Sequence, residues 1–192
     1  MLRTSQVATH PSGPYAIPTD FCRLFEKDMD RLYLLAFLLT TDHAAAESCF
    51  VQGLEDATNS NRVFKEWADS WARRMIIQSA IQSVHPRPEE GGHSDLNSQR
   101  EAEPLAIRAI VSLRAFERFV FVMSVLERYS DQDCSLLLDC TRGEVIAART
   151  RALQQIASSE ALYSEAATIA AREEVRRESG TRRESAPRLA YA

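Results

Sequence analysis

Apolar residues recur at helical spacing through most of the chain, and the pattern is clearest between residues 114 and 156. The first run in this segment follows the i, i+3, i+4, i+7 rule, which places side chains on one face of a helix. Its members are Phe116, Phe119, Val120, Met123 and Leu126. Ser130 then lies three residues before Asp133, a capping pattern that predicts the start of a second, short helix.

A stronger capping-box pattern, Thr141 followed by Glu144, predicts a third helix in the same segment. One side of that helix is apolar, with Val145, Ala148, Ala152 and Ile156. A short helix, a turn of a few residues and a second capped helix are the pattern of a helix-turn-helix, whose later helix reads the DNA major groove with its amino-terminal end. The sequence therefore predicts a DNA-reading helix from Thr141 to Leu153.

The amino-terminal part of the chain predicts three further helices. The first begins at Thr19 or Asp20 and ends near Thr40, and the second covers 43–57. The third covers 63–84, where four large apolar residues have helical spacing: Phe64, Trp67, Trp71 and Met75. A tryptophan pair at this spacing usually belongs to a core, so we expect both tryptophans to be largely buried.

Proline, glycine and charged residues mark the domain boundaries. Three prolines and a glycine in residues 1–18 predict a flexible arm, and three prolines, a Gly-Gly pair and dense charge in 85–104 predict a linker. Residues 158–192 are expected to pass from helix to disordered tail. We therefore expect an all-α protein with two small helical domains, 19–84 and 105–157, joined by a flexible linker.

Composition restricts the classes of function. The net charge is −4 and the pI is near 5.6, whereas a chain that binds nucleic acid through its overall charge is usually basic. Any DNA contact must then come from a local patch or from a partner. The chain shows neither a signal-peptide pattern nor an apolar run approaching ~20 residues, so we expect a cytoplasmic protein without a membrane partner.

Candidate chemistry is sparse. The four cysteines lie among apolar residues, and we expect them to be buried thiols: Cys22, Cys49, Cys134 and Cys140. They form no C-x-x-C pair, so no metal site is expected. Catalytic motifs such as H-E-x-x-H, G-x-S-x-G and the phosphate-binding glycine loops do not occur. We expect a protein that is not an enzyme and needs no cofactor.

One set of residues keeps the order and spacing of a known promoter-recognition pattern, without a gap, from residue 113 to residue 152. The set is Leu113, Arg118, Val120, Phe121, Glu127, Tyr129, Ser130, Asp133, Leu137, Cys140, Thr141, Gly143, Val145, Arg151 and Ala152. With these residues the segment resembles region four, the carboxy-terminal promoter-recognition domain of the extracytoplasmic-function group of bacterial sigma factors.

A second set lies in the amino-terminal helices: Leu32, Tyr33, Leu35, Ala36, Leu39, Thr40, Asp42, Ala46 and Glu47, then Phe64, Trp67, Ala72 and Arg73. These residues resemble region two of the same group. In that family the domain docks on the clamp helices of the polymerase β′ subunit and opens the −10 promoter element.

The resemblance implies a protein that directs core RNA polymerase to promoter DNA. The polymerase surfaces it implies are the β′ clamp helices and the β flap, and an anti-sigma factor is a further candidate partner. The implied polymerase-binding residues are Asp42, Glu47, Ser48 and Gln52. The implied DNA-binding residues are Thr141, Arg142, Gly143, Glu144, Ala147, Thr150 and Arg151.

The recognition helix is less basic than the family pattern, and this keeps two other hypotheses open. Where the family has Lys-Ser-Arg-Leu, the chain has Ile146-Ala147-Ala148-Arg149. A sigma-like regulator that has lost promoter recognition would bind protein without DNA. A stand-alone helix-turn-helix protein with an unrelated amino-terminal domain would bind DNA without polymerase.

Overall fold

The computed structural model describes residues 13–60, 62–88 and 104–159, and this part of the chain is built of helices. The amino-terminal unit contains α1 (Pro18–Lys27), α2 (Met29–Thr40), α3 (His43–Thr58), the 3-10 turn η1 (Lys65–Trp67) and α4 (Ala68–Val84). The carboxy-terminal unit contains α5 (Leu105–Val111), α6 (Ala115–Phe121), the π-helical turn η3 (Val122–Leu126), α7 (Asp131–Leu137) and a last helix described over 142–159. The all-α prediction is confirmed for the described residues.

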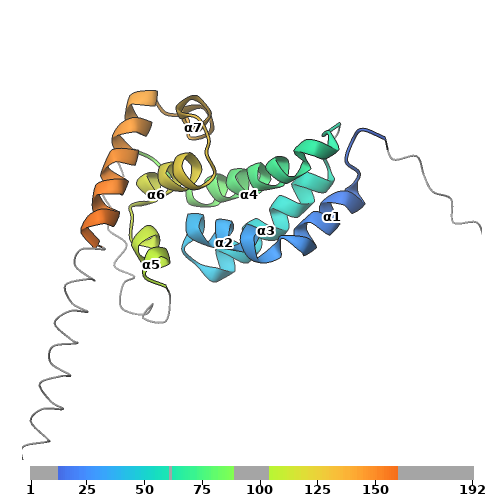
Figure 1. Cartoon of the computed structure of the whole chain (residues 1–192), viewed down its shortest axis with the longest axis horizontal. Helices are drawn as coiled ribbons and strands as arrows, with labels where there is room; N and C mark the ends of the chain where they lie inside the picture. The colour runs from blue at the N-terminus through green and yellow to red at the C-terminus, as the bar shows by residue number, and fades with distance from the viewer. Residues whose placement is uncertain (1–12, 61, 89–103, 160–192) are drawn as a thin grey trace, which may run out of the picture.

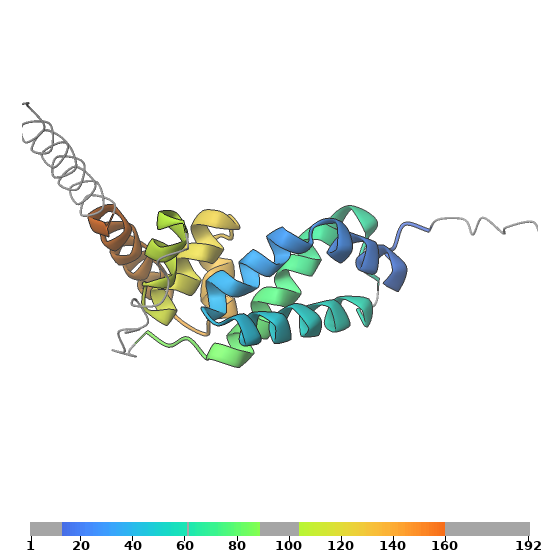
Figure 2. The same ribbon diagram turned by 90° about the horizontal axis from the view of Figure 1, so that it is seen from below.

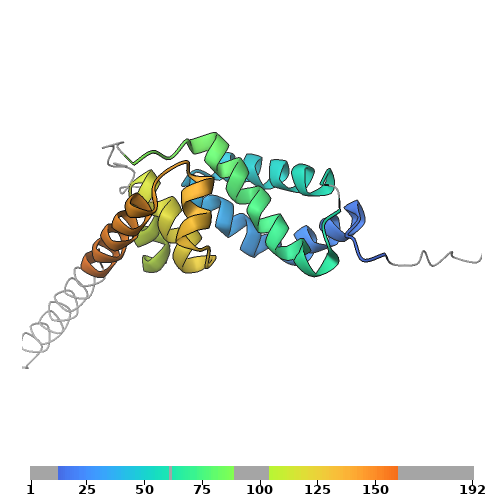
Figure 3. The ribbon, with the colours of Figure 1, turned by 90° about the horizontal axis from the view of Figure 1, so that it is seen from above.

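The two units lie end to end (Figure 1). Helices α1 to α4 form an elongated bundle, and the carboxy-terminal unit stacks on the end that is remote from α1, as the views in Figures 2 and 3 also show. Helix α2 contacts α5, α6 and η3, and buried residues of both units form one continuous hydrophobic cluster. Most of the predicted linker, residues 89–103, lies outside the described residues, as do most of the arm and the tail.

The first predicted helix is divided into two. Asp28 leaves the helical conformation, with φ −109° and ψ 25°, and separates α1 from α2. In one continuous helix Asp28 would lie on the same stripe as the buried Phe25 and Leu32, which would place a carboxylate in the core. The break lets both helices bury their apolar faces and leaves the carboxylate near the surface.

Two other predictions about burial are wrong in part. Trp67 is 57% exposed because it belongs to the 3-10 turn before α4 and so lies outside the apolar stripe of that helix. Cys22 is exposed on α1, whereas Cys49 and Cys134 are buried and Cys140 is half-buried. Burial raises the pKa of Cys134 to about 11, so this thiol stays protonated.

Helices α3 and α4 approach closely at Gly53. A Cβ atom at this position would lie 2.8 Å from Cγ1 of Ile76 and 3.2 Å from its backbone nitrogen, so only glycine fits without a shift of α4.

No helix among the described residues is both long enough and apolar enough to cross a membrane.

The contact between the units is centred on Arg118, whose side chain is buried. Its Nη1 donates to the Leu113 carbonyl at 2.9 Å and its Nη2 to the Leu39 carbonyl at 3.2 Å. Leu39 is in the last turn of α2, where helix carbonyls lack partners within the helix. Arg118 therefore joins the end of α2 to the segment that leads into α6.

Arg118→Met should lower the free energy of unfolding by about 2–4 kcal/mol, because it keeps the length of the side chain but leaves two buried carbonyls without these donors. Urea unfolding followed by circular dichroism measures the loss. Arg114→Met, at an exposed position in the same segment, is the matched control and should change stability by less than about 0.5 kcal/mol. Equal effects of the two variants would contradict the role given to Arg118.

Candidate nucleic-acid interface

Helix α7 and the helix at 142–159 are both fixed at their starts by side-chain caps. The Asp133 backbone N–H donates to the Ser130 hydroxyl at 3.1 Å, and the Ser130 N–H donates to the Asp133 carboxylate at 3.3 Å. The connection between the helices passes through Asp139, whose φ is 50°. Residues from both helices enter the core: Cys134, Val145, Ala148 and Ala152.

The start of the later helix is a complete capping box. The Thr141 N–H and hydroxyl donate to Glu144 Oε2 at 2.7 and 2.8 Å, and the Glu144 N–H donates back to the Thr141 hydroxyl at 3.2 Å. The backbone bond and then the hydroxyl bond lower the pKa of Glu144. Glu144 is therefore an ionised cap, and its carboxylate would repel a phosphate.

The predicted DNA-binding residues other than Glu144 are all exposed: Thr141, Arg142, Gly143, Ala147, Thr150 and Arg151. Gly143, Ala147 and Thr150 share one outward face with Ile146 and Leu153, which are 48% and 47% exposed. The Thr150 hydroxyl is turned back to the Ile146 carbonyl at 2.9 Å. This face is close to neutral and offers few donors to bases or phosphates.

The arginines of this helix have partners inside the protein. Arg149 pairs with Asp131, and the Arg151 Nε donates to Glu117 Oε1 at 2.6 Å. Glu117 is only 4% exposed, so Arg151 neutralises a buried carboxylate. Arg142 is different, because its Nε donates to the neutral Gln132 side chain and it keeps an unneutralised charge. A glutamate inside the apolar run of α6 was the only sequence signal for the Arg151 pair.

Three of the predicted polymerase-binding residues share one face of α3. Glu47, Ser48 and Gln52 are exposed there, together with the apolar Val51. Asp42 lies at the start of the same helix, where its carboxylate accepts the Ala45 N–H at 2.8 Å. The Gln52 amide donates to Asp56 at 3.0 Å. The structure thus brings the residues together on an acidic surface, where Glu47 is exposed and Asp42 and Asp56 accept hydrogen bonds only from neutral groups.

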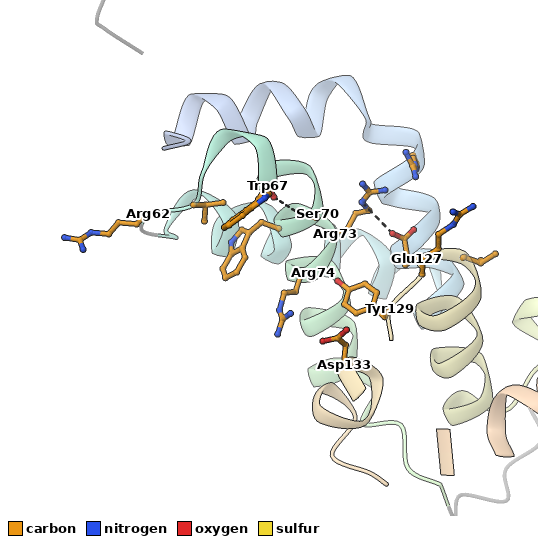
Figure 4. Close-up of a pocket in the computed structure, with 13 residues that line it drawn as sticks. Arg62, Trp67, Ser70, Arg73, Arg74, Glu127, Tyr129 and Asp133 are labelled. Atoms are coloured by element: carbon orange, nitrogen blue, oxygen red, sulfur yellow. Dashed lines mark hydrogen bonds and ion pairs between the residues drawn. The ribbon is translucent and has the colours of Figure 1, made fainter. Parts of the chain in front are cut away.

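A basic groove, which the sequence did not predict, lies where the two units meet (Figure 4). Its volume is about 770 Å³. Five arginines line it, and we call it the arginine groove: Arg31, Arg62, Arg73, Arg74 and Arg128. Aromatic side chains complete the wall, namely Trp67, Trp71 and Tyr129. The groove joins residues some sixty positions apart in sequence, so no local pattern could indicate it.

Arg151→Ala should destabilise the fold by about 1–3 kcal/mol, because it leaves the Glu117 carboxylate buried without a cation. Thermal and urea unfolding measure the loss. Glu117→Gln combined with Arg151→Ala should recover most of it, because the uncompensated charge is then gone. Additive effects of the two substitutions would show that Arg151 has no coupling to Glu117.

Thr141→Ala should raise the pKa of Glu144 towards 4.5, its ordinary value, because one of the two hydrogen bonds to the carboxylate is lost. A carboxylate whose pKa is lowered by folding stabilises the fold at every pH above its pKa in the unfolded chain. That stabilisation is lost as the pH falls through the lower pKa of the folded state. The variant should therefore show a weaker dependence of helix stability on pH below about pH 4.5. An NMR titration of the Glu144 side chain in both proteins measures the change in pKa. An unchanged pKa would contradict the role of Thr141 in the cap.

No family model matches this chain, and no curated protein is similar enough in sequence to count as a match.

Proposed function

We propose that the chain is a sigma-factor-like transcription initiation protein that binds core RNA polymerase and contacts promoter DNA with the helix that begins after Thr141. Helix α7, the short connection and this helix would then act as a helix-turn-helix. Polymerase would be met by the α3 face that carries Glu47, Ser48 and Gln52.

The observation that carries the proposal is the exposed amino-terminal end of the helix at 142–159. Unpaired N–H groups and the helix dipole give such an end a partial positive charge. The ionised Glu144 carboxylate reduces this charge, and the unneutralised Arg142 cation restores the attraction for a DNA phosphate. Arg142 is exposed at this end, and Gly143 leaves the backbone open, since a Cβ there would meet nothing closer than 3.9 Å. The capping box holds the end in a fixed geometry.

The same geometry implies that the chain binds DNA weakly by itself. Arg149 and Arg151 are held by carboxylates, so few cations remain to contact phosphates. Each phosphate contact contributes about −0.9 to the slope of log K against log salt concentration. The polymerase contact then supplies the affinity, and the helix selects the promoter.

The exposed apolar residues of the helix favour a second candidate function. Ile146 lies about one turn into the helix and Leu153 about two turns further along the same face, where a DNA-reading helix needs polar groups. A regulator of sigma-like fold could use this face to bind a protein partner and have no promoter contact.

The Ile146→Lys variant separates the two functions, because it restores a cation on the exposed face. If the face meets DNA, duplex promoter fragments should bind more tightly, with a salt slope steeper by about one. Arg142→Ala should make the slope shallower by about one, while Arg23→Ala on α1 serves as the surface control. Fluorescence anisotropy at several salt concentrations measures all of them.

Pull-down of core RNA polymerase followed by run-off transcription on a pool of promoter fragments completes the test. Polymerase binding with new transcripts, reduced by Arg142→Ala, is the expected result. Polymerase binding without transcripts, together with loss of a captured protein in Ile146→Lys, would favour the regulator. A chain that captures no polymerase at all would overturn the sigma proposal.

A further inference from the structure

The arginine groove is built from three departures from regular helix. Arg62 has φ 62° and Arg128 has φ 59°, a left-handed conformation that is uncommon for residues other than glycine. Between α6 and Arg128 the chain forms the π turn η3, closed by a bond from the Glu127 N–H to the Val122 carbonyl at 2.9 Å. Such irregularities cost free energy and concentrate at functional sites. All three lie in segments that line the groove.

The groove holds an excess of positive charge. Its lining has five arginines and two carboxylates, Glu127 and Asp133. Only Arg73 is paired, with Asp69 and with Glu127, whose Oε2 lies 3.6 Å from the Arg73 Nε. Within the described ranges, the other four form no ion pair: Arg31, Arg62, Arg74 and Arg128. In a chain of net charge −4, this local excess indicates an anionic ligand.

An aromatic surface lies beside these charges. Trp67 packs edge-on against Phe64, with ring centroids 5.2 Å apart, and remains 57% exposed. Trp71 is fixed in the wall by a bond from its Nε1 to the Ser60 hydroxyl at 2.8 Å. Figure 4 shows Trp67 on the same side of the groove as Arg62, whose side chain extends outward from it, and Tyr129 beside Arg74 further along. An exposed indole at this position offers a stacking surface for a planar base.

We propose that the arginine groove binds a free nucleoside polyphosphate, with its base on Trp67 and its phosphates on the arginines of the groove. A volume of about 770 Å³ lies in the range of small-molecule sites, which is about 300–1,000 Å³. Arginine presents several N–H donors in one plane and suits phosphate oxygens. This binding is separate from the promoter contact proposed for the helix at 142–159.

A compact ligand suits the charge distribution better than a long strand does. The part of the chain outside the groove has a more negative net charge than the whole chain, because five cations and only two carboxylates lie within the groove. Outside the groove the surface bears exposed carboxylates such as Glu26, Glu47 and Glu55, so a polynucleotide that extends beyond the groove meets a surface of net negative charge. Its phosphates would be repelled there, whereas a nucleotide contained in the groove avoids them.

Glu127 sets the affinity of the groove. It neutralises Arg73 and places a negative charge in the wall contributed by the carboxy-terminal unit. An incoming phosphate is repelled by this carboxylate and gains by replacing it at Arg73. Glu127→Gln should therefore tighten nucleotide binding by a few-fold, opposite in sign to the arginine variants.

The test titrates the full chain with ATP and with GTP in buffer containing EDTA, and measures tryptophan fluorescence and heat. Both tryptophans of the chain line the groove, so fluorescence reports directly on the site. Adenosine and guanosine test the base and sugar without phosphates, and inorganic tripolyphosphate tests the phosphates without a base. A single-stranded oligothymidylate tests whether the groove binds a nucleic-acid strand instead.

Saturable binding of ATP or GTP is expected, with adenosine, guanosine and tripolyphosphate each weaker by about tenfold or more. Arg74→Ala, Trp67→Ala and Arg62→Asn should each weaken binding by about tenfold. Asparagine tolerates the left-handed backbone, so Arg62→Asn removes the charge from an exposed position without disturbing the fold. Arg23→Ala should bind as the unmodified chain does.

Three results would overturn the proposal. One is the absence of saturation by either nucleotide at millimolar concentration. Another is tripolyphosphate binding as tightly as ATP and GTP, which would leave an anion site without base recognition. The third is tight binding of the oligothymidylate alone, which would assign the groove to a nucleic-acid strand. None of these results depends on whether the chain binds RNA polymerase.

Discussion

The buried guanidinium of Arg118 is the interaction on which the arrangement of the two units depends. It donates to one carbonyl from each unit, at Leu39 and at Leu113. A charge in this environment is stable only when its donors are satisfied, so the end of α2 and the segment before α6 must stay together. Apolar burial around it continues from the amino-terminal helices into α6 and η3 without interruption.

This contact places the two candidate sites. It brings the segment after η3 against α4, where the arginine groove forms, and leaves the helix at 142–159 on the outside of the carboxy-terminal unit. The arginines of the two sites differ in their partners. Those of the helix at 142–159 mostly neutralise carboxylates of the same unit, as Arg151 does for Glu117, while most of those in the groove form no ion pair with a described residue. Within the part of the chain that the structure describes, the groove therefore has more unpaired positive charge than the predicted DNA-reading helix.

Local rules recovered most of the helices. Capping boxes at Ser130 and Thr141 gave the starts of α7 and the last helix, because these bonds join residues only three positions apart. Apolar periodicity gave the buried faces and the all-α class. It placed Trp67 in the core because periodicity cannot tell the turn before a helix from the helix itself. The break at Asp28 could have been anticipated from its place on an otherwise apolar stripe.

The candidate sites were harder to predict, because they depend on contacts between distant residues. The family resemblance implied that Arg151 contacts DNA, and in the structure its side chain pairs with a buried glutamate 34 positions away. The groove is lined by Arg62 and Arg74 from the amino-terminal unit and by Arg128 from the carboxy-terminal unit. Only the packing of the units, which no local pattern encodes, brings these side chains together.

Hydrogen–deuterium exchange of the chain with and without core RNA polymerase tests the central claim most directly. The account predicts slower exchange in α3, around Glu47, Ser48 and Gln52, when polymerase is present. Unchanged exchange along α3, with polymerase at concentrations that saturate known sigma proteins, would contradict it.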